Sequence, residues 1–150
     1  MSSPSFLPLN LEPSITIKNS PASAEIDLLR SRLLAFNRSH VPDPNYRPLL
    51  LTVSGGTGEM AGGLFAQLYH SWMFVELLWV EEELRGRGIG ARLLAQAEEQ
   101  AREHGCHSAW LDTFGFQAPN FYRKQGYEVF GELPRYPDEH RRYFFCKKLG

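Results

Sequence analysis

A glycine-rich segment in the middle of the chain constrains its fold more than any other feature. Residues 85–91 read RGRGIGA, and they separate an apolar run over residues 72–80 from a stretch of helical periodicity that starts at Gly88. Glycines allow a tight turn and close approach of the backbone to a ligand, and a helix N-terminus presents unpaired N–H groups. A purely structural turn would not need two arginines. The segment therefore predicts a pyrophosphate cradle, made of Arg85, Gly86, Arg87, Gly88, Ile89 and Gly90.

A nicotinamide dinucleotide is an alternative ligand for this cradle. Gly86, Gly88 and Ala91 also fit the dinucleotide fingerprint, and Asp112 lies about where that fingerprint places its ribose-binding acid. However, the fingerprint follows its strand directly, whereas residues 81–84 intervene here, and a doubly wound sheet needs several helices downstream where this sequence predicts one. The dinucleotide stays open as the weaker alternative.

The order of apolar periods predicts an α/β chain of the α+β type, with a mixed central sheet of about six to seven strands and flanking helices. Three strands form an antiparallel meander before the glycine-rich segment. The strand over 72–80, the helix that starts at Gly88 and a strand over 108–113 form a βαβ unit with parallel strands. The other predicted elements are a strand at 15–18, a helix around 26–36, a short helix at 118–125 and strands at 127–133 and 142–148.

Length and composition favour one folded domain and argue against several classes of protein. The 150 residues are 43% hydrophobic and 22% charged, so we expect a single domain over residues 1–150, with a flexible N-terminal extension at 1–13. A formal net charge of -1 argues against binding to nucleic acid or to membranes. The two cysteines lack metal or disulfide spacing, and no segment resembles a leader or a membrane span. We therefore expect a cytoplasmic protein without a metal site.

Two motifs make the chain resemble the GNAT N-acetyltransferase family. RGRGIG at 85–90 is similar to the acetyl-CoA motif of that family, and APNFYRKQGY at 118–127 is similar to its second signature. The resemblance covers residues 15–149 and implies an N-acetyltransferase that takes acetyl-CoA as co-substrate. It implies transfer of the acetyl group to a primary amine of a small molecule, by direct attack in a ternary complex. One departure is Gly115, which stands where many members carry a cofactor-binding asparagine; Asn120 is the candidate to replace that contact.

The resemblance also assigns roles at the centre of the reaction. It implies that the strand ending at Leu78, Trp79 and Val80 splays from its neighbour, so that free backbone N–H groups bind the pantetheine arm and polarise the acetyl carbonyl. Tyr122 matches the family's proton donor to the coenzyme A thiolate. A phenol pKa of about 10 and a thiol pKa of about 8.5 make that transfer feasible. The alternative is that Tyr122 only packs, as aromatic residues on short amphipathic helices usually do.

Glu76 is the candidate general base. It interrupts an otherwise apolar strand and resembles an acidic residue that some family members carry there. A carboxylate among apolar neighbours has its pKa raised toward neutrality, which suits a base. An ion pair with an arginine, a solvated strand edge, and ordered waters in place of a dedicated base stay open as alternatives.

Two loops, residues 37–48 and 134–140, are the candidates for acceptor recognition. They carry Asp43, Tyr46 and Tyr136, and acids and aromatic rings of this kind attract a protonated amine. The sequence leaves open whether the acceptor is a small molecule or a protein lysine, and whether the chain forms a homodimer. It also leaves open a non-catalytic acyl-CoA-binding or sensing module, although such a module would not need the Tyr122 phenol.

Overall fold

The computed structural model describes residues 12–150, in two compact units that divide after Pro42. The first unit contains α1 (Ser23–Arg38), which follows the predicted periodicity and places Glu25 in its first turn and Arg38 in its last, the arrangement that the helix dipole favours. The strand predicted at 15–18 is wrong, because this segment is neither helix nor strand. β-branched residues form a strand only where a neighbouring strand supplies partners for their backbone hydrogen bonds. Most of the extension predicted at 1–13 lies outside the described residues.

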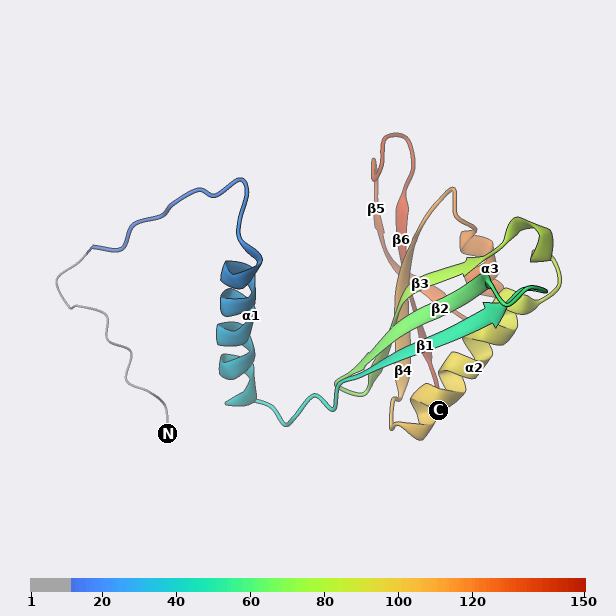
Figure 1. Ribbon diagram of the computed structural model, residues 1–150, viewed down its shortest axis with the longest axis horizontal. Coiled ribbons are helices and arrows are strands. Elements are labelled where there is room, and N and C mark those ends of the chain that lie inside the picture. Colours follow the sequence, from blue (N-terminus) through green and yellow to red (C-terminus); the bar gives the residue numbers. More distant parts are fainter. Residues whose placement is uncertain (1–11) are drawn as a thin grey trace. The chain divides into compact units, whose positions relative to one another are not determined.

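The second unit is built on a mixed six-stranded sheet, which confirms the predicted α+β fold class (Figure 1). The strands lie in the order β1-β2-β3-β4-β6-β5, and β3 pairs with β4 in parallel while the other neighbours pair antiparallel. None of the helices among residues 12–150 combines the length and hydropathy that a membrane span requires. The elements are β1 (Arg47–Ser54), β2 (Met60–Tyr69), β3 (Trp72–Val80), η1 (Glu82–Leu84), α2 (Ile89–Glu103), β4 (Ser108–Phe114), α3 (Pro119–Lys124), β5 (Glu128–Leu133) and β6 (Arg142–Lys148).

Helix α2 packs its apolar side against one face of the sheet (Figure 1). Its buried apolar residues recur at helical spacing, as the sequence predicts, and they meet buried side chains of the central strands, among them Leu64, Met73, Leu111 and Phe145. Burial of one leucine side chain stabilises the fold by about 1.5–3 kcal/mol. The apolar layer therefore fixes α2. It also fixes the end of the glycine-rich segment where that segment enters the helix, and we call residues 85–90 of the segment the glycine loop.

A buried polar cluster ties the middle of α2 to the end of the sheet. Glu98 is only 5% exposed, and its carboxylate accepts hydrogen bonds from the Tyr127 hydroxyl at 2.8 Å and from the Lys147 ammonium at 2.9 Å. Removing one partner of such a pair leaves a buried charge uncompensated and costs about 3–5 kcal/mol. Because Tyr127 follows α3 closely, the cluster also ties the end of α3 to α2.

Strands β3 and β4 separate partway along their length. Their pairing runs from Trp72 with Ser108 to Val75 with Leu111 and ends there. β3 bends at this point because Glu76 is an extra residue, a β-bulge, between the residues that pair with Phe65 and Ala66 of β2. We call this divergence the β3–β4 fork. It is the splayed strand pair that the family resemblance implies.

Candidate active site

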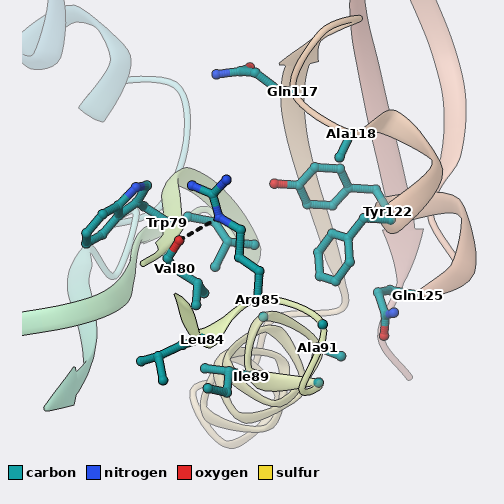
Figure 2. A pocket seen from close by; sticks show the side chains of 15 residues that line it. Trp79, Val80, Leu84, Arg85, Ile89, Ala91, Gln117, Ala118, Tyr122 and Gln125 are labelled. Atoms are coloured by element: carbon teal, nitrogen blue, oxygen red, sulfur yellow. Dashed lines mark hydrogen bonds between the residues drawn. The ribbon is translucent and has the colours of Figure 1, made fainter. Parts of the chain in front are cut away.

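A cleft of about 520 Å³ lies between the end of β3, the glycine loop and α3 (Figure 2). The structure brings most of the predicted cofactor-binding residues together in its lining, namely Leu78, Trp79, Val80, Arg85, Gly86, Gly88, Ile89 and Gly90. Two predicted residues do not line it. Arg87 is exposed, and Asn120 accepts a hydrogen bond from Arg123 at 2.9 Å, so that its amide oxygen is already engaged on α3.

The glycine loop has the geometry of an anion site. Gly86 and Gly88 both have φ of 76°, a left-handed conformation that side chains disfavour, and an added Cβ would meet nothing within 4 Å at either position. Gly88 is the N-cap of α2, and neither a side-chain cap nor an acidic residue occupies the first turn. The N–H groups and positive dipole end of a 15-residue helix therefore face open space, which fits the pyrophosphate of acetyl-CoA.

A second cavity, of about 490 Å³, adjoins this cleft on the other side of the fork. It adds Glu76, Asp112 and Phe116, which do not line the first cleft. The two cavities share residues from the end of β3, the glycine loop and the segment from β4 into α3, namely Leu78, Trp79, Val80, Arg85, Gln117, Ala118 and Tyr122. A ligand in the cleft and a ligand in the second cavity therefore meet at Tyr122.

Tyr122 is held in place by aromatic neighbours. Its ring centroid lies 5.0 Å from that of Phe121 and 5.9 Å from that of Phe145. Burial, together with the negative charge of Asp112, raises the pKa of Tyr122 to about 12. The phenol is therefore a weaker acid than the ordinary tyrosine assumed from the sequence, and it stays protonated over the physiological range. Figure 2 shows its oxygen pointing across the cleft toward the Arg85 side chain, whose Nε donates to the Val80 carbonyl at 2.9 Å.

Glu76 lines the second cavity, but not in the setting that the sequence predicts. The expected apolar enclosure is wrong, because the bulge turns this residue out and leaves it exposed. Its carboxylate accepts a hydrogen bond from the Gln67 side-chain amide. No cation among residues 12–150 forms an ion pair with it, so its charge is available to an incoming ammonium group.

Asp112 is a site residue that sequence reasoning missed, because it entered there only through the weaker dinucleotide alternative. As the ribose-binding acid of a dinucleotide it would face the glycine loop, but it lines the second cavity and not the cleft. Its carboxylate pairs with Arg142 of β6, whose Nε donates to Oδ1 at 2.8 Å. The alternation of Trp110, Asp112 and Phe114 indicates that these three side chains share one face of β4. The ion-pair partner of Asp112, however, depends on the pairing of β4 with β6.

The acceptor candidates in the loops lie in different places. Tyr136 stacks near Arg142, with the guanidinium carbon 4.9 Å from its ring centroid, and it lines neither cavity at the fork. Tyr46 lines a separate hollow of about 480 Å³, and Asp43 accepts the Asn45 N–H at 2.8 Å in a local turn. Gly115 lines neither cavity at the fork; its N–H donates to the Arg141 carbonyl at 2.8 Å.

Comparison with known proteins identifies the family of the chain. The chain belongs to the Acetyltransferase (GNAT) family, whose profile matches residues 19–127. It is an N-acetyltransferase with acetyl-CoA as co-substrate, which sets aside the nicotinamide and non-catalytic alternatives.

Individual relatives support the family assignment and the fold. Blasticidin-S acetyltransferase of Streptomyces morookaense is 43% identical over 96 residues, which cover 63% of this chain and 71% of that protein. The crystal structure of an acetyltransferase from Bacillus cereus superposes with a TM-score of 0.82 at 31% identity, over 89% of this chain and 97% of that one. Aminoglycoside 6'-N-acetyltransferase complexed with coenzyme A shares the fold, with a TM-score of 0.62 at 16% identity over 89% and 95% of the two chains.

Proposed function

We propose that the chain acts as one N-acetyltransferase domain that acetylates a primary amine of a small molecule by direct attack in a ternary complex. The observation that carries this proposal is the junction of two cavities at the β3–β4 fork. One cavity contains the anion cradle, the other contains unpaired negative charge at Glu76, and Tyr122 borders both. Two ligands bound side by side across a fork can react without an intermediate carried by the protein.

The chain's contribution on the cofactor side is binding and orientation. Acetyl-CoA supplies an acetyl group activated as a thioester. Gly86, Gly88 and the N-terminus of α2 would hold its pyrophosphate, and Arg85 adds a positive charge next to them. The backbone N–H groups along Leu78 to Val80, on the edge that β4 has left, are the donors for the pantetheine arm and the acetyl carbonyl.

Tyr122 supports the leaving sulfur as a hydrogen-bond donor. With its pKa at about 12, complete transfer of the proton to a thiolate of pKa about 8.5 is uphill by about 5 kcal/mol. A neutral phenol nevertheless stabilises negative charge that develops on sulfur, because the hydrogen bond strengthens as the charge grows. The acceptor nitrogen loses a proton on acetylation. Tyr122 gives its own proton to the sulfur only as this proton from the nitrogen replaces it.

Glu76 receives the acceptor. Its exposed carboxylate attracts the ammonium form, and the proton that must leave before attack passes through Glu76 to solvent. The kind of acceptor follows from the relative named for blasticidin S, which supports a small-molecule amine rather than a protein lysine. We also propose a cytoplasmic location, since Cys106 and Cys146 are both free thiols, as expected in a reducing compartment.

Two measurements test this function. Acetyl-CoA at about a hundredfold excess over its Kd should raise the free energy of unfolding by about 2.7 kcal/mol, and a nicotinamide dinucleotide should not. A panel of small amines and lysine peptides, with thiol release and product mass as readouts, should give N-acetylated product with a small amine only. Thiol release at the same rate without any amine would indicate thioester hydrolysis and contradict the proposal.

Glu76→Gln separates acceptor binding from cofactor binding. We expect kcat/KM for the amine to fall by about 10-fold to 100-fold, because the attracting charge and the proton path are lost together, while the Kd of acetyl-CoA stays the same. Glu99→Gln is the matched control, since Glu99 is an exposed glutamate on α2 that lines neither cavity. Equal kinetics for Glu76→Gln and the parent would assign the base to ordered water.

A further inference from the structure

The carboxylate of Asp112 is held by only one of its two oxygens. Both contacting nitrogens of Arg142, Nε and Nη2, reach the same atom, Oδ1. No hydrogen bond from residues 12–150 reaches Oδ2, although the Asp112 side chain is only 17% exposed. Since Asp112 lines the second cavity, its second oxygen keeps its acceptor capacity on the side where an acceptor molecule would bind.

Three aromatic rings surround Arg142 and restrain its guanidinium group beside Asp112. Its guanidinium carbon lies 5.3 Å from the ring centroid of Phe114, 4.9 Å from that of Tyr136 and 5.5 Å from that of Phe144. Planar guanidinium groups stack well on aromatic faces, and the side chain is only 25% exposed. Asp112 is therefore a negative group of fixed position, which loses little entropy when it binds a ligand.

Glu76 and Asp112 are neighbours on the two arms of the fork. Each follows directly after the last parallel pair, Val75 with Leu111, and both line the second cavity. Paired strands lie about 4.8 Å apart, so the two residues start from neighbouring backbone positions, and both side chains line the same cavity. Arg142 compensates the charge of Asp112, whereas among residues 12–150 only the neutral Gln67 amide donates a hydrogen bond to Glu76.

We propose that Asp112 is a specificity-determining residue that binds a second, non-reacting cationic group of the acceptor. The inference rests on the proposed function, with Glu76 receiving the amine that becomes acetylated. The preferred acceptor is then a small dication, either a diamine or an amine with a guanidinium group. A charge-assisted hydrogen bond to a fixed carboxylate in a partly enclosed cavity contributes about 10-fold or more to the preference for such a molecule. Phe116, which lines the same cavity, covers the apolar stem between the two cations.

The test compares cadaverine with aminopentanol, which has a hydroxyl group in place of the second amine. For the parent we expect kcat/KM to be about tenfold higher or more with cadaverine. Asp112→Asn should reduce this ratio to about one or two, with the Kd of acetyl-CoA unchanged within about twofold. Because the Asp112 charge also acts on Tyr122, absolute rates change with both amines, and the ratio of the two kcat/KM values cancels that common effect. Agmatine, an amine with a guanidinium group, should follow cadaverine.

Arg142→Gln shows whether charge or structure causes the effect. Asp112→Asn and Arg142→Gln both break the ion pair, but only Asp112→Asn removes the carboxylate. For Arg142→Gln, kcat/KM with cadaverine should therefore stay about fivefold or more above kcat/KM with aminopentanol. Glu132→Gln is the matched control, because it breaks the ion pair between Glu132 and Arg141 in the same hairpin, outside both cavities. Its preference for cadaverine should equal that of the parent.

Each outcome decides the inference. An equal loss of preference in Asp112→Asn and Arg142→Gln, a parent ratio near one, or acetylation of other amines but of neither test compound would overturn it. A parent that binds acetyl-CoA and acetylates no amine at all would refute the proposed function instead, and the two failures are therefore distinguishable.

Discussion

The two sides of the β3–β4 fork are built in different ways. On the cofactor side the binding groups belong to the backbone, at Gly86, Gly88 and the first turn of α2. On the acceptor side they are side chains, of which Glu76 and Asp112 come from different strands. A backbone cradle needs consecutive residues in a fixed conformation, so it changes little without loss of function. A side-chain site can change by single substitutions on the same sheet, so we expect it to determine the acceptor.

Gly88→Val should have the largest effect, because it alters the backbone cradle itself. A β-branched residue disfavours the φ of 76° at the N-cap, and its side chain would fill the open space in front of the helix N-terminus. We expect acetyl-CoA binding to be abolished in calorimetry while the folded fraction stays measurable in a melting curve. Gly56→Val is the control, since a Cβ there also meets open space, in the turn between β1 and β2. Parental affinity in a folded Gly88→Val variant would mean that the phosphates bind elsewhere.

Tyr122→Phe should have the next largest effect and should leave cofactor binding intact. The substitution deletes a hydroxyl group whose hydrogen bond strengthens only as charge develops on sulfur, so kcat and kcat/KM should fall together by about 10²–10³-fold. Tyr127→Phe is the matched control. It removes the hydrogen bond to buried Glu98, so we expect stability to fall by about 1–3 kcal/mol with kcat within a few-fold of the parent. Equal kcat for Tyr122→Phe and the parent at every pH would leave Tyr122 a packing residue.

The same contrast explains which parts of the molecule the sequence predicts. The glycine loop, α2 and the parallel strand pair follow from local periods and turn residues, and the structure confirms them. The isolated pattern at 15–18 fails because a strand also needs a partner, which local sequence does not encode.

The site shows this limit in its individual residues. Most of the predicted cofactor residues line the cleft because they are consecutive, whereas the exposure of Glu76 depends on a bulge and the partner of Asp112 on the register between β4 and β6. The raised pKa of Tyr122 likewise depends on burial by Phe145 and on a charge from another strand. Tertiary pairing sets all three, and a single sequence carries little signal of it.

A pH dependence of stability checks the surroundings of Tyr122. The folded-state pKa is about 12 for Tyr122 and is also raised for Tyr127, by burial and by the Glu98 charge, whereas tyrosines of the unfolded chain titrate at about 10. The folded state thus holds these protons more tightly, so the free energy of unfolding should be highest below pH of about 10 and fall as pH rises toward about 12.

Tyr122 alone should account for roughly 2–3 kcal/mol of that loss. Denaturant unfolding at several pH values between about 8 and about 11, with tyrosinate absorbance recorded in parallel, measures the beginning of the decline. In Tyr122→Phe the free energy of unfolding should fall less steeply with pH. An identical decline in parent and variant would contradict the burial of the phenol.

Arg87→Ala should have the smallest effect, although its charge lies inside the motif that defines the cradle. Arg87 is exposed and lines neither cavity, and exposed charges contribute about 0–1 kcal/mol, which is up to about fivefold in the Kd of acetyl-CoA. Because salt screens such a contribution, the difference from the parent should shrink as ionic strength rises. Arg141→Ala, an exposed arginine outside both cavities, should bind like the parent. A loss of more than about tenfold that salt does not reduce would mean that Arg87 turns into the cleft and grips the phosphates directly, and the cofactor side would then depend on side chains as the acceptor side does.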